Sequence, residues 1–191
     1  MKKLLLVCTL FLAAVTTYGQ GQVFFANDST TRFTTNGGAG KVGNLTGLNT
    51  YRIGMYTAPA GTVNEALFTL TATATNSSSP IAPGQFSYPE SPYTFAANNG
   101  TAIAVQIRAW SLAAGATYEA AVATGNPNYY GGKTAIGAVT PAVGGAAPPS
   151  LFGAGAVFTS GVVLTPLVPE PSSIALGLLG LGAIALFRRR K

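Results

Sequence analysis

The chain has 191 residues, enough for one main domain with tails. Charged residues make up only 8% of it, about a third of the ~25% usual for soluble globular chains, whereas 48% are hydrophobic. The formal net charge of +6 comes from the two ends, because residues 20–168 hold five basic and four acidic residues. This distribution excludes the basic surface that binds nucleic acid, so we expect no nucleic-acid partner.

The composition also limits the chemistry of the middle of the chain. The single cysteine, Cys8, lies near the N-terminus, and there is no histidine. Residues 20–168 therefore cannot build Ser-His-Asp or Cys-His catalysis, and they lack typical zinc ligands. They contain neither a calcium-binding loop nor a phosphate-binding glycine motif. We therefore expect no metal and no cofactor.

Residues 1–19 have the order of a secretory signal peptide. Two lysines precede the apolar run Leu4–Val15, and small or polar residues follow it. We expect cleavage near Gly19, with Gly21 as a second site, so that Cys8 leaves with the signal. A retained anchor is the alternative, but a run of twelve residues is too short to span ~30 Å of hydrocarbon at ~1.5 Å per residue.

Residues 20–165 have the pattern of one β-rich domain. Several segments alternate with period 2, and Gly-, Pro- and Asn-rich turns separate them. We predict an all-β fold, a single antiparallel β-sandwich (Ig-like or jelly-roll-like) flanked by an N-terminal signal helix and a C-terminal transmembrane helix. Tyr118–Ala123 could begin a short helix instead of a strand. The candidate strands are Gln22–Ala26, Tyr51–Thr57, Leu67–Thr75, Tyr93–Ala97, Thr101–Trp110, Tyr118–Ala123 and Ala156–Leu164.

Thr101–Trp110 contains the first candidate for ligand contact. Its apolar residues recur at every second position from Ile103, while Arg108 and Trp110 share the opposite face. An aromatic ring beside a cation can stack on a sugar or form a cation–π pair. In the alternative interpretation, Trp110 packs under a neighbouring loop and Arg108 covers it, because buried area is the usual use of tryptophan.

Two further features could contact a ligand. Tyr129 and Tyr130 follow one another in a turn-rich loop, and exposed loop tyrosines suit carbohydrate or protein contacts. In the alternative, one of them fills the end of the sandwich. Threonine favours exposed strand positions, but regular threonine rows are also a feature of ice-binding surfaces. One strand has such a row, made of Thr69, Thr71, Thr73 and Thr75.

Four acidic residues remain in the middle of the chain. A carboxylate pair of the glycosidase kind is arithmetically possible among them. Scattered acids are more often solvated surface charges, so we expect no enzyme activity. The four are Asp28, Glu65, Glu90 and Glu119.

The C-terminus has three consecutive parts. The triplet Pro169, Glu170, Pro171 comes first, and its prolines disfavour helix and keep this segment extended. The apolar run 174–187 follows, and its fourteen residues give only ~21 Å of helix, short for a permanent anchor. The positive-inside rule holds the final basic cluster on the cytoplasmic side. This cluster is Arg188, Arg189, Arg190 and Lys191.

This tail resembles the PEP-CTERM sorting signal of bacteria that make extracellular polysaccharide. The resemblance covers Val168–Lys191 and rests on the triplet, the glycine-bearing apolar run and the terminal arginines. It implies that an exosortase, a membrane transpeptidase-like enzyme, recognises the tail and cuts it near Pro169–Pro171. The implied partners are exosortase, the secretion machinery, the inner membrane and extracellular polysaccharide. An ordinary C-terminal membrane tail is the alternative.

The sequence therefore predicts an exported, non-enzymatic protein. It would pass through an inner-membrane-anchored intermediate to the cell surface or the extracellular matrix. A carbohydrate-binding or adhesive surface module is the alternative function, and an ice-binding protein is a more remote one. The predicted segments are a signal peptide (1–19), a β-sandwich domain (20–165), a linker with the Pro-Glu-Pro motif (166–173), a short transmembrane helix (174–187) and a basic cytoplasmic tail (188–191).

Overall fold

The computed structural model describes residues 20–35, 43–45, 50–77 and 82–167. The predicted signal peptide, transmembrane helix and basic tail lie outside these residues. Within them, no helix has the length and apolar character needed to cross a membrane.

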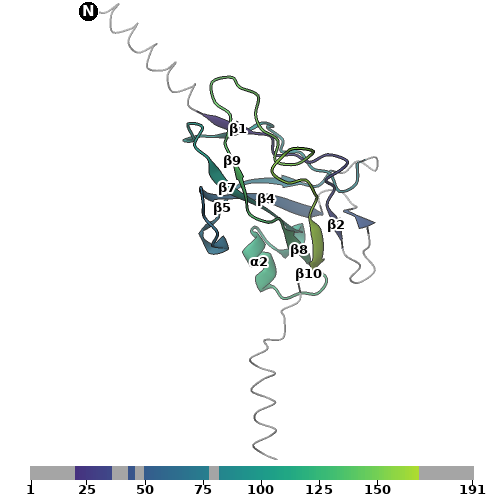
Figure 1. Cartoon of the computed structure of the whole chain (residues 1–191). Coiled ribbons are helices and arrows are strands. Elements are labelled where there is room, and N and C mark those ends of the chain that lie inside the picture. Colours follow the sequence, from purple (N-terminus) through teal and green to yellow (C-terminus); the bar gives the residue numbers. More distant parts are fainter. Residues whose placement is uncertain (1–19, 36–42, 46–49, 78–81, 168–191) are drawn as a thin grey trace, which may run out of the picture.

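The described part is mostly β-structure, as predicted, with short helices between strands (Figure 1). Its strands are β1 (Gly21–Val23), β2 (Thr34–Thr35), β3 (Gly43–Asn44), β4 (Tyr51–Pro59), β5 (Thr69–Thr75), β6 (Tyr93–Phe95), β7 (Ile103–Ser111), β8 (Tyr130–Lys133), β9 (Gly137–Val139) and β10 (Val163–Pro166). Its helices are the 3₁₀ turns η2 (Glu65–Leu67) and η3 (Leu112–Ala114) and the α-helix α2 (Tyr118–Ala123).

The strands do not form the two antiparallel sheets of the predicted sandwich. Among the described residues, eight strands form one sheet in the order β3-β2-β10-β8-β7-β4-β5, with β9 also paired to β7, while β1 and β6 form a separate antiparallel pair. The sheet is mixed, because β10 pairs with β2 in parallel. Parallel pairing needs a long crossover connection, and here the whole chain between β2 and β10 supplies it.

The two longest strands, β4 and β7, form the centre of the sheet. They pair antiparallel along their whole length, from Tyr51 opposite Ser111 to Pro59 opposite Ile103. The predicted alternation of β7 is confirmed, because its alternate residues face two different hydrophobic clusters. Both faces of this strand are therefore buried.

The first cluster lies on one face of the central strands and is rich in aromatic rings. Phe33, Phe86 and Phe152 meet edge to face, with ring centroids 5.3 to 5.8 Å apart. Such pairs add about 0.5–1.5 kcal/mol each beyond the burial of their area. The long loops that carry these rings are thereby fixed on the sheet.

The second cluster lies on the opposite face and contains Tyr56, Trp110, Ala121 and Leu167. Gly54 makes room for it, because a Cβ at this position would lie 2.9 Å from both the Trp110 and the Tyr56 rings. The short helices η2 and α2 contribute neighbouring residues, since Glu65 and Glu119 line a hollow together with Arg108.

Three sequence predictions differ from the structure in the C-terminal half. Tyr118–Ala123 is the helix α2, the alternative left open above, because its alanines favour helix and Thr117 caps it. Ala156–Leu164 becomes a strand only at Val163. Tyr130–Lys133 is strand β8, where a turn was predicted, because its glycines let β10 approach closely. A Cβ at Gly132 would lie 2.5 Å from the Val163 carbonyl oxygen.

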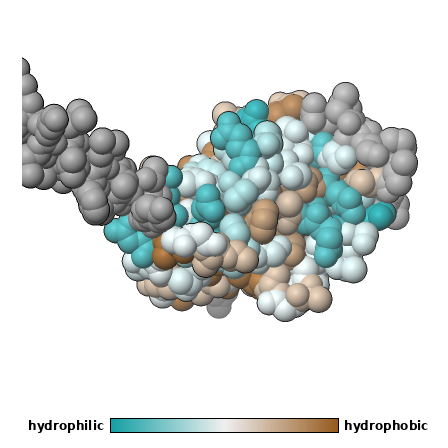
Figure 2. Space-filling view, turned by 90° about the horizontal axis from the view of Figure 1, so that it is seen from above, coloured by the Kyte–Doolittle hydropathy of each residue, from teal (hydrophilic) through white to brown (hydrophobic). Residues whose placement is uncertain are grey.

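The two ends of the described part lie far apart. β1 is at one end of the molecule, and β8, β10 and α2 are together at the other (Figure 1). Figure 2, a view from above, shows a surface on which pale, weakly polar residues are mixed with scattered polar and apolar ones. This mixture fits the low charge of the chain.

Candidate functional site

Arg108 lies in the middle of β7, on the face of the second cluster. Its side chain is only 6% exposed. A buried guanidinium needs hydrogen-bond acceptors for its N–H groups, because removing an unpaired charge from water costs on the order of several kcal/mol. The groups that meet this need define the site.

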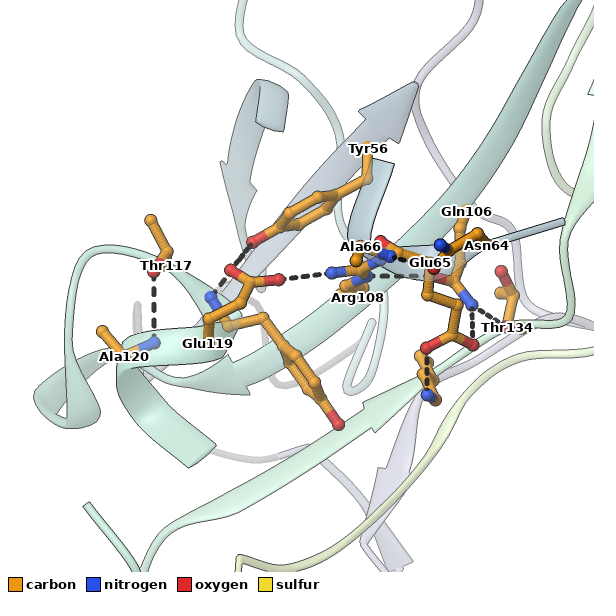
Figure 3. Close-up of polar contacts among 12 residues, drawn as sticks. Tyr56, Asn64, Glu65, Ala66, Gln106, Arg108, Thr117, Glu119, Ala120 and Thr134 are labelled. Atoms are coloured by element: carbon orange, nitrogen blue, oxygen red, sulfur yellow. Dashed lines mark hydrogen bonds and ion pairs between the residues drawn. The ribbon is translucent and has the colours of Figure 1, made fainter. Parts of the chain in front are cut away.

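Four elements, β4, η2, β7 and α2, supply these partners (Figure 3). The guanidinium donates through Nε to Gln106 Oε1 at 2.9 Å and through Nη2 to the Glu65 carbonyl oxygen at 2.9 Å. Its Nη1 forms an ion pair with Glu119. Its central carbon lies 4.2 Å from the centroid of the Tyr56 ring, within cation–π range. Arg108 thus links both η2 and α2 to the same face of the sheet.

The two carboxylates of this cluster are both hydrogen-bonded. Glu65 forms an ion pair with Lys133, and its Oε1 accepts a hydrogen bond from Gln106 Nε2 at 3.0 Å. The bond from Lys133 is the main reason that the pKa of Glu65 lies below its usual value, and the hydrogen bond from Gln106 is the second. Glu119 Oε2 accepts a hydrogen bond from Tyr56 Oη at 3.0 Å.

Tyr56 connects β4 to the start of α2. Its hydroxyl accepts a hydrogen bond from the Tyr118 backbone N–H at 3.1 Å while it donates to Glu119. Burial raises the pKa of Tyr56 to about 12, so the hydroxyl keeps its proton at neutral pH. The proton is therefore available for the bond to Glu119.

Local caps position the two helices that carry the carboxylates. Asn64 caps η2 with its side-chain oxygen, which accepts from the Ala66 N–H at 3.1 Å. Thr117 caps α2 in the same way, by accepting from the Ala120 N–H at 3.2 Å. Both caps are drawn in Figure 3. The capping residues therefore set where Glu65 and Glu119 enter the cluster.

A hollow of about 450 Å³ opens between η2 and α2. Both carboxylates face it, and each forms an ion pair, Glu65 with Lys133 and Glu119 with Arg108. Among the described residues, no group of three acidic, cysteine or histidine side chains could hold a metal ion. The hollow is lined by Glu65, Phe68, Arg108, Tyr118, Glu119 and Val122.

The predicted ligand contacts do not form one surface. Trp110 and Tyr130 are fully buried. Trp110 donates from Nε1 to the Gly115 carbonyl oxygen at 2.9 Å and meets Tyr118 edge to face, so it packs under a loop as the alternative interpretation expected. Arg108 stacks on Tyr56 rather than on Trp110. Neither buried ring offers a face to a ligand.

Tyr129 is half-buried and lines a different hollow of about 430 Å³. The loop before it is fixed by an Asx turn, in which Asn126 Oδ1 accepts from the Asn128 N–H at 2.9 Å. The other predicted contacts, Arg108, Trp110 and Tyr130, are absent from its lining. Its walls include Thr50, Leu112, Ala113, Asn128 and Tyr129.

The acidic residues are less scattered than expected. Asp28 and Glu90 are exposed, as solvated charges would be, but Glu65 and Glu119 meet at Arg108. Sequence reasoning missed this convergence and did not single out Tyr56 or Gln106. One signal was available: Gln106 and Arg108 are polar residues two positions apart inside an apolar strand. Such residues must find partners from other elements.

The predicted threonine row lies on β5 at the edge of the sheet. Thr69, Thr73 and Thr75 are exposed, and Thr71 is half-buried. The hydroxyls of Thr71 and Thr57 lie 2.6 Å apart, so part of the row is hydrogen-bonded to the neighbouring strand β4.

The folded part continues two residues beyond the predicted domain end at 165. Pro166 pairs with Tyr130 in the sheet. Leu167 is only 9% exposed, belongs to the second cluster and donates its N–H to the Tyr129 carbonyl oxygen at 2.7 Å. The described fold therefore includes Leu167, which stands two residues before Pro169 in the sequence.

From this residue onward the chain matches a family model. Residues 167–191 match the PEP-CTERM protein-sorting motif. The match supports an exosortase-substrate protein. The PEP-CTERM motif includes Pro169, Glu170, Pro171 and the terminal basic cluster, which lie outside the described residues. It implies exosortase as the processing partner, export, and a membrane-anchored intermediate. No curated protein and no solved structure matches the chain.

Proposed function

We propose that this protein is a non-enzymatic component of the cell surface or the extracellular matrix, delivered there when exosortase processes its tail. The observation that carries the proposal is the match to the sorting motif at residues 167–191, whose first residue, Leu167, is buried in the folded domain. The signal-like residues 1–19 support the same route, because they would direct the domain across the membrane.

The Arg108 cluster supports a structural role for the domain. Glu65 and Glu119 are the two acids that face a common hollow, and both are held by cations and hydrogen bonds. The pKa of Glu65 is lowered, whereas a catalytic acid at neutral pH requires a raised one. The cluster connects η2 and α2 to the sheet, and this structural role accounts for its charged residues.

The low charge of the domain supports an assembled state. Residues 66–89 and 134–167 contain no charged side chain. A surface whose net charge is close to zero favours association over mutual repulsion. The weakly polar surface in Figure 2 fits a component of a matrix better than a freely diffusing protein.

The test is the intact mass of the protein recovered from membrane and medium fractions of its native host. We expect a species that lacks both ends, cut near Gly19 and near Pro169–Pro171. A protein that keeps 174–191 in every fraction would be an ordinary membrane-anchored protein, and the proposed route would be wrong.

The basic cluster provides a second test of the route. Neutral residues in place of Arg188–Arg190 remove the charges that orient the tail. We expect impaired membrane retention or reversed orientation of the tail, measured by protease protection in isolated membranes. Unchanged topology and unchanged processing would contradict the role proposed for this cluster.

A carbohydrate-binding or adhesive module is the second candidate, and the hollow at Tyr129 favours it. An aromatic ring, the Asn128 amide and the Thr50 side chain meet there without a charged residue, a lining that suits a neutral sugar. Tyr129→Ala should then weaken retention on a neutral polysaccharide gel. Tyr93→Ala, which changes a tyrosine outside the hollow, should leave it unchanged.

A further inference from the structure

The start of the sorting motif is part of the folded domain. The family match begins at Leu167, and this residue is buried in the second cluster. Its N–H donates a hydrogen bond to the Tyr129 carbonyl oxygen at 2.7 Å. This bond extends the pairing of β10 with β8 by one residue, because the last pair of that ladder is Pro166 opposite Tyr130. The motif is thus joined to the sheet without a spacer.

Gly131 shapes the place where Leu167 docks. A Cβ at Gly131 would lie 2.6 Å from Leu167 Cδ2 and 3.2 Å from Tyr118 Cε2. The absence of a side chain at Gly131 therefore lets Leu167 sit against β8 and beside α2. This fit fixes Leu167 in one position.

Chain length then limits how far the triplet can lie from the sheet. Pro169 and Pro171 follow Leu167 by only two and four residues in the sequence, and one residue of an extended chain spans at most about 3.6 Å. Cleavage breaks one peptide bond near the triplet: the acyl carbon passes to the nucleophile of the enzyme, and the new amine leaves with the tail. An enzyme that binds several residues before that bond meets Leu167 and Pro166 while they are in the sheet.

We infer that Leu167 is a positioning residue that controls exosortase processing because it is fixed in the folded domain two residues before the triplet. This inference rests on the proposed function. The enzyme gains full access when the end of β10 opens locally, and the rate follows the population of this open form. Docking of Leu167 therefore slows cleavage and links it to the folded state of the domain.

The decisive variant is an insertion of Gly-Ser-Gly-Ser-Gly-Ser between Leu167 and Val168 in the full-length chain. It leaves the contacts of Leu167 in place and moves the triplet away from the sheet. We expect processing in the native host, followed by pulse-chase, to become at least about threefold faster. An unchanged thermal midpoint of the processed domain would show that the fold is unaffected.

Leu167→Ala tests the same contact without a change in chain length. It should also speed processing, and Leu167→Met should restore the parent rate because it refills the site. In the insertion background Leu167→Ala should add less than about 1.5-fold, since the motif is already accessible. This non-additivity distinguishes positioning from general destabilisation, which would act equally in both backgrounds.

Two outcomes would overturn the inference and leave the proposed function intact. One is an insertion variant processed at the parent rate or slower, and the other is full additivity of the two changes. A separate variant, Glu170→Ala with both flanking prolines replaced by alanine, tests the proposed function. If that variant is processed as fast as the parent chain, the sorting route fails and the inference fails with it.

Discussion

Arg108 shows how much one buried cation contributes to this fold. Its guanidinium reaches Gln106 on its own strand, the backbone of Glu65 in η2 and the carboxylate of Glu119 in α2. Both helices are short, so neither would be stable alone in water. Their position depends on the cluster beneath them.

Arg108→Ala should therefore destabilise the domain by about 2–4 kcal/mol, because it removes several charge-assisted hydrogen bonds and takes the cation away from Gln106 Oε1 and the Glu119 carboxylate. Denaturant unfolding measures this difference. Arg52→Ala is a matched control on the neighbouring strand, where the arginine donates to the Ala116 carbonyl oxygen in an exposed contact. It should cost less than about 1 kcal/mol, and an equal loss in both variants would contradict the special role of Arg108.

Asp28 stabilises its loop in a pH-dependent way. Its Oδ1 accepts hydrogen bonds from the backbone and the hydroxyl groups of Thr30 and Thr31, at 2.7 to 3.0 Å. These bonds, led by the Thr30 hydroxyl, lower the pKa of Asp28 from 3.8 to about 2. A lowered pKa stabilises the fold above pH 3.8, and the effect is lost as the pH falls through about 2.

Asp28→Asn should therefore lower the thermal midpoint at pH 6, and the difference from the parent should shrink as the pH falls from 4 to about 2. Thermal melts over this range measure it. Glu90→Gln, a change at an exposed acid elsewhere, controls for the loss of one negative charge. A difference that stays constant down to about pH 2 would exclude ionised Asp28 as the cause.

At the scale of elements, sequence periodicity predicted the long strands well. Turn-forming residues flank β4 and β7, and side chains of two kinds alternate along each strand. The sequence pattern therefore agrees with the way these strands pack between two clusters. The short strands β2, β3 and β9 could not be predicted, because two or three residues carry no period. Their pairing depends on partners far away in the chain, as Thr34 shows by pairing with Val163.

The register of β4 gives a prediction about its glycine. Gly54→Ala places a Cβ 2.8 to 2.9 Å from Leu70, Trp110 and Tyr56, and the overpacking should cost about 1–3 kcal/mol of unfolding free energy. Thr73→Ala, opposite Gly54 on β5 and exposed, should change stability by less than about 0.5 kcal/mol. Chemical unfolding of both variants checks this, and a neutral Gly54→Ala would mean that Trp110 can move aside.

At the scale of the whole molecule, two residues assigned to the linker, Pro166 and Leu167, pack with the folded domain. The sequence placed the domain boundary at 165, because Pro166 begins a proline-rich segment. The structure extends β10 to Pro166 and buries Leu167. Proline is acceptable there because it fills the last position of the strand.

Two truncated proteins test this boundary. Residues 20–167 should be more stable than residues 20–165 by about 2–4 kcal/mol, since the shorter one loses a buried leucine and its hydrogen bond. Thermal and denaturant unfolding compare them directly. Equal stabilities would mean that Leu167 contributes little to the second cluster.

The candidate site was harder to predict than the fold. The tail could be interpreted from sequence because its signal is linear, three parts in a fixed order. The Arg108 cluster depends on four elements that meet in space, and Glu65 and Glu119 lie far apart in the chain. Burial of Trp110 was favoured by its size, but no local pattern distinguishes the buried Tyr130 from the half-buried Tyr129.

The position of β10 has a consequence for the timing of folding. This strand lies between β2 and β8 in the sheet, although it is the last strand of the described chain. Synthesis proceeds from the N-terminus, so β2 and β8 are made before β10 (Val163–Pro166), the strand that pairs with both of them. The sheet can close only after nearly the whole polypeptide has been made. Until then this sheet lacks one of its inner strands, and an incompletely folded chain is the form that a narrow export channel requires.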